Sequence, residues 1–329
     1  MNRRDSLLLA LGALCVAPFT VGAQPGGRTA RIGMLLPNSA EIVARNPRIA
    51  AFLRGLRELG WIDSRNVAIE WRFAEGQTAR LAELAADLVR SKVDVIVTAA
   101  SPAALAAQRA TQSIPIVVLD PGDPVGLGLV ASLARPGGNI TGVTSIAPDL
   151  AAKRLALLKE AAPATSRAVV LADAATPPAE VAIREMEDAA KVLGVQIQLV
   201  AIQGARGLEQ AFGEIARLRA DGMVVFPDPL TFSNAAAITG FARTNRIPAL
   251  YGAAEFAQAG GLMSYGPSYQ DMFRRGANYV DRILKGTKPA ELPVEQPTHF
   301  EIVWCDITAR GIGDALSQSV LLRADRVIE

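Results

Sequence analysis

Four polar residues follow predicted strands of this chain, and side chains at such positions can bind a charged small molecule. Ser101 stands before Pro102 at the start of a predicted helix, where unpaired N–H groups and the helix dipole suit a carboxylate or a phosphate. Asp120, Asp173 and Asp228 each come after a predicted strand. Open α/β sheets bind ligands at the carboxyl ends of their strands. Together these residues can hold a carboxylate and an ammonium, although each one alone is also a common cap or turn residue.

The sequence offers few groups for catalysis. It contains a single histidine, His299, and Cys305 follows in the same strand-like segment. A zinc site needs more ligands than these two, and such a pair is more often coincidence than a catalytic dyad. The partial glycine pattern at 126–128 has Ala131 in place of its third glycine, and neither a phosphate-binding loop nor a nucleophile elbow occurs. We therefore predict a binding protein that is not an enzyme, with no metal and no cofactor.

The first 23 residues have the three parts of a secretory signal peptide. Residues 1–4 carry two basic side chains, Arg3 and Arg4, residues 7–21 are mostly apolar, and small or apolar residues precede a cleavage site after Ala23. The alternative is a membrane anchor, but the apolar run is shorter than the roughly 20 residues that span a bilayer and is broken by Pro18. We predict export to the periplasm, with the general secretory and twin-arginine routes both open.

Composition narrows the class of protein further. Half of the residues are hydrophobic, 5% are aromatic, and the formal net charge is +2. This composition suits a parallel sheet covered by helices, and without a basic stripe nucleic acid is a poor partner. An exported chain also meets no cytosolic pool of NAD or ATP. That removes the nucleotide-enzyme interpretation which an α/β pattern otherwise favours.

Strand and helix patterns alternate along the rest of the chain in two sets. Short apolar runs predict the strands, and apolar residues at helical spacing predict the helices. The first set has strands at 31–36, 67–73, 93–97 and 114–119, with helices at 47–60 and from residues 78 and 101. The second has helices at 149–161, 178–193, 207–219 and 232–245, with strands at 168–172, 195–200, 222–226 and 247–250. This alternation indicates βαβ units, and hence an α/β fold of two Rossmann-like lobes, each with a parallel sheet.

Three further segments suit connections between the two lobes. A Pro-Gly-Gly-Asn turn at 136–139 leads into extended residues 140–143, and a strand at 261–266 precedes a long helix at 268–284. A proline-spaced stretch at 292–297 suits a chain that crosses back. We predict one lobe from residues 24–143 and about 267–298, and the other from 144–266 and about 299–329.

A set of specific motifs extends from about residue 30 to the C-terminus. It comprises FLRGLRELGW at 52–61, KVDVIV at 92–97, SPAA at 101–104, GDPV at 122–125, ARPGGNITGV at 134–143, AGGLMSYG at 259–266 and LLRADRVIE at 321–329. As a set, these motifs resemble the tryptophan/tyrosine-type substrate-binding proteins of bacterial ABC importers, a family with the type I periplasmic-binding fold.

The resemblance implies a two-lobed binder with a hinge of three crossovers, which closes on a small solute and delivers it to an ABC permease in the inner membrane. The first crossover falls near Val143 to Ser145. The residues that the resemblance places at the cleft are Asn38, Ser39, Ser101, Pro102, Ala103, Asp173, Asp228 and Tyr251. Asp120, from its strand end, and Ser145, from the crossover, complete the predicted set.

Some relatives bind aromatic amino acids, and two residues here suit such a ligand. Ser101 with nearby N–H groups is expected to hold a carboxylate, and Asp228 to pair with an amine. The loop at 119–122 and the dipeptide Asp173-Ala174 depart more from the family's pattern, so the identity of the ligand side chain stays open. We expect a monomer. Two alternatives to an importer component are an exported hydrolase-like enzyme and a periplasmic sensor that passes its ligand state to a receptor.

Overall fold

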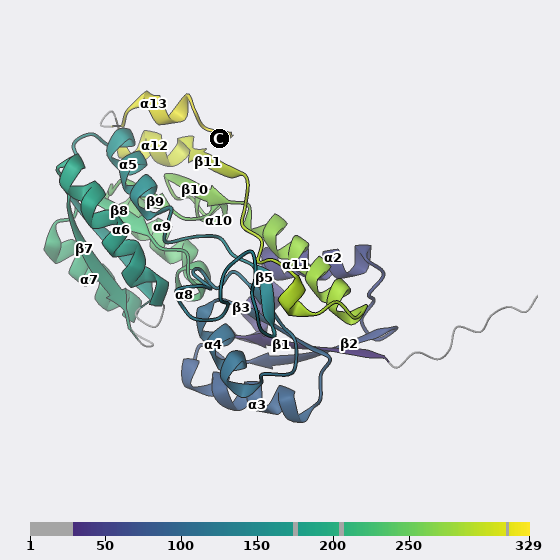
Figure 1. Cartoon of the computed structure of the whole chain (residues 1–329). Coiled ribbons are helices and arrows are strands. Elements are labelled where there is room, and N and C mark those ends of the chain that lie inside the picture. The colour runs from purple at the N-terminus through teal and green to yellow at the C-terminus, as the bar shows by residue number, and fades with distance from the viewer. Residues whose placement is uncertain (1–28, 174–176, 204–206, 314–315) are drawn as a thin grey trace, which may run out of the picture.

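The computed structural model of the protein describes residues 29–173, 177–203, 207–313 and 316–329. Figure 1 shows two sheets with helices packed around each of them. The predicted signal peptide at 1–23, with its cleavage site after Ala23, lies outside the described residues. Within those residues, no helix has the length and apolar character needed to span a membrane.

The first sheet has five strands in the order β2-β1-β3-β4-β5, and every neighbouring pair is parallel. Met34 in the middle of β1 pairs with Trp71 on one side and with Val97 on the other. Because parallel strands end at the same edge, the residues that follow them are brought together. The strands are β1 (Ala30–Leu36), β2 (Val67–Phe73), β3 (Val95–Ala99), β4 (Ile116–Leu119) and β5 (Ile140–Val143).

Helices cover both faces of this sheet because its strands are apolar on both sides. On one face, α3 (Leu81–Arg90) and α4 (Ser101–Ala110) pack over Leu35 and Ile96. On the other face, α2 (Pro47–Glu58) and α11 (Tyr269–Leu284) pack against each other over Met34 and Val97. The short α1 (Ala40–Ala44), η1 (Thr78–Arg80) and η2 (Pro289–Glu291) complete this part, which we call the first lobe.

The second sheet has seven strands in the order β12-β11-β10-β9-β8-β6-β7. We predicted a parallel sheet, and all of its pairs are parallel except that of β10 with β11. The exception arises because the chain returns to this sheet from the first lobe and enters it against the direction of β10. The strands are β6 (Arg167–Asp173), β7 (Gln196–Ile202), β8 (Gly222–Val225), β9 (Ala249–Tyr251), β10 (Met263–Pro267), β11 (Phe300–Cys305) and β12 (Arg326–Ile328).

Helices also cover both faces of the second sheet, and together they form the second lobe. On one face, α5 (Ala151–Ala161) and α6 (Pro177–Leu193) pack over Val170 and Val224. On the other, α7 (Gly207–Leu218), α9 (Ala235–Thr244) and α10 (Ala254–Gln258) pack over Leu171 and Val225. The remaining helices are α8 (Pro229–Ser233), α12 (Asp306–Ile312) and α13 (Gln318–Leu321).

Local sequence explains where the helices nearest the cleft begin and end. Asn46 caps α2, since its Oδ1 accepts the N–H of Arg48 at 2.9 Å, and Pro47 occupies the first helical position. The single helix expected at 232–245 is in fact two, α8 and α9. Asn234 separates them, because its backbone, with φ −111° and ψ 19°, departs from helical geometry, and its side chain donates to the carbonyl of Leu230 at 2.8 Å.

The chain passes between the sheets at three places. It leaves the first sheet after Val143, leaves the second after Pro267, and returns to the second along residues 292–299. The first and third crossings lie side by side, because the Glu295 N–H donates to the Gly142 carbonyl at 2.9 Å and the Thr144 N–H donates to the Glu295 carbonyl at 3.0 Å. The backbone of the hinge is therefore hydrogen-bonded to itself.

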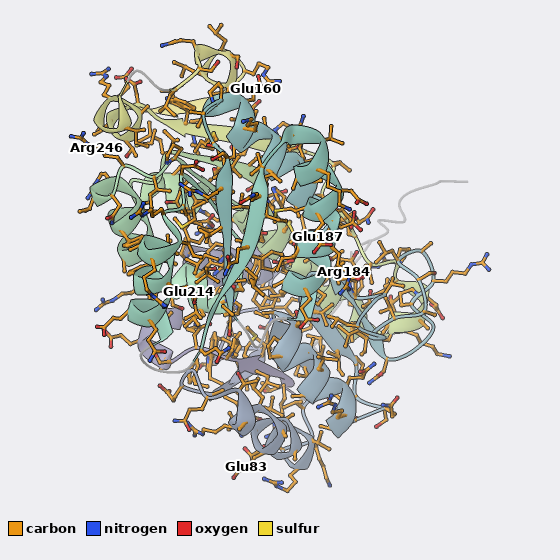
Figure 2. All side chains as sticks on the ribbon, turned by 90° about the vertical axis from the view of Figure 1, so that its left-hand side faces the viewer. Glu83, Glu160, Arg184, Glu187, Glu214 and Arg246 are labelled. Atoms are coloured by element: carbon orange, nitrogen blue, oxygen red, sulfur yellow. The ribbon has the colours of Figure 1, made fainter. Side chains whose placement is uncertain are left out.

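Charged residues lie mostly on the outer surfaces of both lobes. Figure 2 labels six of them, of both signs, which project outward from the helices or the loops that follow them: Glu83, Glu160, Arg184, Glu187, Glu214 and Arg246.

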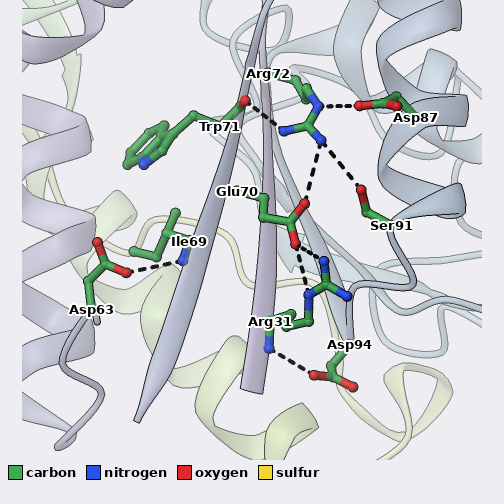
Figure 3. A network of polar contacts seen from close by, with 9 residues as sticks. All are labelled: Arg31, Asp63, Ile69, Glu70, Trp71, Arg72, Asp87, Ser91 and Asp94. Atoms are coloured by element: carbon green, nitrogen blue, oxygen red, sulfur yellow. Dashed lines mark hydrogen bonds and ion pairs between the residues drawn. The ribbon is translucent and has the colours of Figure 1, made fainter. Parts of the chain in front are cut away.

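One polar network ties the edge strand β2 to its neighbours (Figure 3). Arg31 Nε donates to Glu70 Oε1 at 2.8 Å, and the Arg31 N–H donates to Asp94 Oδ2 at 2.8 Å. Arg72 Nη2 contacts Glu70 Oε2 at 3.5 Å and Arg72 Nε contacts Asp87 Oδ2 of α3 at 2.5 Å. These charges are engaged with one another, so we assign the network to the stability of the first lobe.

Candidate functional site

A cavity lies between the two lobes at the strand ends, and residues of both lobes line it. It holds about 650 Å³ of free space, the part open to solvent included. The first lobe contributes the loops after β1, β3 and β4 and the start of α2, and the second contributes the loop after β8 and α8. The lining residues are Leu36, Pro37, Asn38, Asn46, Arg48, Ile49, Ala99, Ala100, Ser101, Pro102, Leu119, Asp120, Gly122, Ala147, Phe226, Pro227, Asp228, Pro229, Phe232 and Phe273.

The structure brings five of the ten predicted site residues to this cavity. They are Asn38, Ser101, Pro102, Asp120 and Asp228. They come from four strand ends in two lobes, so only the folded chain places them around one space.

The other five predicted residues do not line the cavity. Ser39 caps α1 by accepting the N–H of Ile42, and Ala103 is buried inside the first lobe. The backbone N–H groups of Ser145 and Asp173 support the carboxylates of Asp120 and Asp228. Tyr251 does not face the cleft as expected. It is fully buried in the second lobe and stacks on Phe256, because β9 directs it toward the helix-covered face.

The start of α4 presents its first N–H groups to the cavity, but the Ser101 hydroxyl does not act as we expected. Ser101 Oγ donates to the Pro121 carbonyl at 2.8 Å, so its proton points away from a ligand. Ala100 before it has φ 67°, a left-handed conformation that turns the chain sharply from β3 into α4. The helix start therefore offers backbone N–H donors to a ligand, and the Ser101 hydroxyl oxygen can only accept a hydrogen bond from it.

Asp120 follows β4 in a left-handed conformation with φ 60°. Its Oδ1 accepts the N–H of Ser145 at 2.9 Å, which holds the carboxylate between the strand end and the first crossover. Burial raises the pKa of Asp120, while Ser145 and the positive charge of Arg48 act in the opposite direction. Asp120 is thus a partly buried acid that can pair with a cation.

Asp228 is both a cavity residue and the cap of α8. Its Oδ1 accepts the N–H of Thr231 at 2.8 Å, and its Oδ2 accepts the N–H of Asp173 at 2.8 Å. Burial raises the pKa of Asp228 to about 7, and these hydrogen bonds only partly oppose that effect. At neutral pH the carboxyl is therefore divided between its neutral and charged forms, and a nearby cation would favour the charged form.

We expect the stability of the protein to fall as the pH rises through the range in which Asp228 titrates. An unfolded Asp titrates near 3.9, so between about pH 4 and the folded pKa of about 7 the native state binds more protons than the unfolded chain. The cost of ionising Asp228 is of order 4 kcal/mol across this range. Asp228→Asn keeps an oxygen for the cap and should remove this part of the pH dependence, as measured by urea unfolding at several pH values.

Asp188→Asn is the matched control for that prediction. Asp188 is exposed, and its bond to Lys191 lowers its pKa, so its removal should change the slope slightly and in the opposite sense. Parallel pH profiles for the wild type and Asp228→Asn would contradict the prediction.

The cavity residues that were not selected from the sequence include Arg48, Phe232 and Phe273. One signal was available for Arg48, because it lies in the first turn of α2, where a positive charge opposes the helix dipole. The phenylalanines carry no comparable signal, since an apolar residue in an amphipathic helix is usually core. Arg48 Cζ lies 3.7 Å from the centroid of the Phe232 ring and 5.6 Å from that of Phe273.

The two lobes also touch at the mouth of the cavity. Asn38 Nδ2, after β1, donates to Ser233 Oγ at 2.7 Å and lies 3.5 Å from the Pro229 carbonyl, both at α8. Figure 1 shows α8 where the two sheets meet. This structure is therefore a closed arrangement of the lobes, with side-chain contacts across the cleft.

Comparison with known proteins identifies the family. The family model for ABC transporter substrate binding protein matches residues 42–328. The chain belongs to this family. A tyrosine-binding protein of Clostridioides difficile (strain R20291) is 26% identical to this substrate-binding protein over 262 residues, which cover 79% of this chain and 75% of that protein.

Solved structures agree with this family and with the predicted fold. An ABC domain of Streptococcus pneumoniae in complex with L-Trp has a TM-score of 0.82 at 25% identity, covering 92% of this chain and all of that chain. A conserved domain protein of Vibrio cholerae has a TM-score of 0.83 at 25% identity, covering 91% of this chain and all of that chain. The α/β fold of two lobes, of the type I periplasmic-binding class, is thereby confirmed.

The His299 and Cys305 side chains do not form a site in this substrate-binding protein. His299 is exposed, whereas Cys305 is buried and its Sγ contacts Thr308 Oγ1 at 3.5 Å. Neither lines the cavity between the lobes. Within the described parts of the chain, no three His, Cys, Asp or Glu side chains are grouped as metal ligands.

Proposed function

We propose that this substrate-binding protein is the periplasmic component of an ABC importer, which binds an amino acid between its lobes and delivers it to the permease without chemical change. The observation that carries the proposal is the inter-lobe cavity, lined from both lobes by a helix start, two acids, a cation and aromatic rings. A ligand that contacts both lobes stabilises the closed arrangement over any open one. Closure then provides the form that a permease recognises.

The charges of the cavity suit the two ends of an amino acid. The N–H groups at the start of α4 can bind the α-carboxylate. Asp228 and Asp120 can pair with the α-ammonium, and that pairing would shift Asp228 toward its charged form at neutral pH. This assignment keeps Asp228 as expected from the sequence and moves the carboxylate donors from the Ser101 hydroxyl to the backbone.

We infer an aromatic ligand from two kinds of support. Phe226, Phe232 and Phe273 line the cavity and can pack against a ring. Two relatives at 25% identity or above, the tyrosine-binding protein of Clostridioides difficile and the L-Trp complex of Streptococcus pneumoniae, are named for aromatic amino acids. The hinge in this proposal comprises the crossings near Val143–Ser145, 266–268 and 292–299, with the lobes on either side of them.

A thermal-shift screen of the purified protein tests the proposed function. Amino acids, pyrimidines and small carboxylates are added singly, and we expect L-tyrosine or L-tryptophan to stabilise the protein most. A ligand at 100 times its Kd adds about 2.7 kcal/mol to the free energy of unfolding, which raises the Tm by roughly 5 °C. Stabilisation by no amino acid would refute the proposal.

Two further measurements separate the alternatives. Recovery of the bound compound unchanged, by mass spectrometry after incubation, rules against a hydrolase-like enzyme. Loss of amino-acid uptake in cells that lack the protein supports an importer, whereas normal uptake with an altered response to the amino acid would identify a sensor.

A further inference from the structure

Arg48 occupies a position between the interior of the cavity and its mouth. It lines the cavity together with Phe232. Both residues also line the adjoining outer pocket, which includes Ser233 and Glu255. Arg48 comes from α2 of the first lobe and Phe232 from α8 of the second, so the pair spans the cleft.

The guanidinium of Arg48 lies against an aromatic ring. Its Cζ is 3.7 Å from the Phe232 centroid, a distance at which the flat guanidinium covers the ring face. The N–H groups of a guanidinium lie in its plane and point away from its edge. A face that is occupied by Phe232 therefore leaves the edge available for a planar, two-oxygen partner.

The charge of Arg48 lacks an acid partner at close range. Among the described residues, no carboxylate forms an ion pair with it, and the hydrogen bond of its guanidinium is to Asn46 Oδ1, at 3.4 Å from Nε. Burial lowers the pKa of Arg48, whereas Glu255 and Asp120 act on it from a greater distance. A buried cation is stabilised most by an anion that can hydrogen-bond to it.

The start of α4 cannot supply a full positive charge for a ligand carboxylate. Its Ser101 hydroxyl donates to the Pro121 carbonyl, and its remaining donors are neutral N–H groups. Among the residues that line the cavity, Arg48 is thus the only one with a full positive charge to pair with a ligand carboxylate.

We propose that Arg48 binds the free α-carboxylate of the solute through its guanidinium edge while Phe232 holds its face. This inference rests on the proposed function and adds a requirement to it: the ligand must carry a carboxylate. Amines and amides with the same side chain should bind much more weakly, because they offer no anion to the buried guanidinium. The contact also couples binding to closure, since the guanidinium is held in place only when α8 of the second lobe lies against it.

Isothermal titration with charged and neutral probes tests the role of Arg48. The probes are L-tyrosine and L-tryptophan, each with its carboxamide. The wild type should bind the acids about 100-fold more tightly than the amides, as expected for a buried charge-assisted pair. Arg48→Gln should lose about 100-fold in affinity for the acids and less than about 3-fold for the amides. Arg48→Lys keeps the positive charge but loses the paired N–H donors of the guanidinium, so its affinity for the acids should lie between those of the wild type and Arg48→Gln.

Arg54→Gln is the matched control. Arg54 lies in the same helix, is exposed, and does not line the cavity, so the variant should bind the acids as the wild type does. The Tm of each variant shows that it is folded. If Arg48→Gln loses the same affinity for acids and amides, Arg48 acts only through its stack on Phe232. If it loses no affinity, Arg48 plays no part in binding. Either result overturns this inference and leaves the proposed function standing. A wild type that binds neither amino acid refutes the proposed aromatic ligand and the inference with it.

Discussion

Replacement of Gly142 by alanine is expected to destabilise the first lobe by about 3 to 5 kcal/mol, because it combines backbone strain with a steric clash. Gly142 has φ 144°, a conformation that side chains rarely adopt. A Cβ at this position would lie 2.1 Å from the Val118 carbonyl oxygen and 2.7 Å from its nitrogen. The clashing atoms are backbone of β4, so β5 would have to move away from its partner strand.

The effect should reach the hinge as well as the sheet. The Gly142 carbonyl accepts the N–H of Glu295, so a displaced β5 also disturbs the contact between the first and third crossings. Urea unfolding measures the loss of stability. Gly138→Ala is the matched control, because a Cβ there meets no atom within 4 Å. Equal stabilities for Gly142→Ala and Gly138→Ala would show that the close approach is not real.

The second large effect is expected for Arg154→Ala. Arg154 is only 1% exposed and lies in α5, where its Nε donates to the Tyr265 carbonyl and its Nη1 to the Ala147 carbonyl, both at 3.0 Å. Alanine leaves both carbonyls without these donors and leaves a void the size of the guanidinium. The protein no longer has to bury a cation, which offsets part of the loss, and we expect a net destabilisation of about 3 kcal/mol.

Arg154 also supports the site, because Ala147 lines the cavity and Tyr265 belongs to β10 just before the second crossing. We therefore expect weaker ligand binding together with the loss of stability. Lys153→Ala is the control, since Lys153 is the exposed neighbour in the same helix. Urea unfolding and ligand titration of both variants provide the measurements. An Arg154→Ala protein as stable as Lys153→Ala would contradict the prediction.

Much of the fold followed from local patterns in the sequence. The apolar run of β1 and the Asn46-Pro47 start of α2 identified these elements, because strand burial and helix capping depend on neighbouring residues. The helix expected at 232–245 is divided at Asn234, whose backbone has φ −111° and ψ 19°, a departure that the spacing of apolar residues does not reveal. The antiparallel direction of β11 depends on where the chain returns from the other lobe, which local patterns do not show.

The site was predicted less completely than the fold. Strand-end position selected Asp120 and Asp228, since parallel strands bring the residues that follow them to one edge. Tyr251 has the same kind of position but faces the core. Arg48 and Phe232 are 184 positions apart, and their contact exists only because two lobes close on each other.

The alternation of strands and helices, the family, and the hydroxyl and acidic residues at the strand ends could be predicted from the sequence, because they depend on residue order along short stretches of chain. Which of those residues share a cavity, and what their side chains can do there, depends on how the folded lobes meet. Ser101 lost its donor role to a carbonyl 20 residues away, and burial gave Asp228 a pKa of about 7. Both effects arise from atoms that become neighbours only when the lobes form and close, so no local pattern carries them.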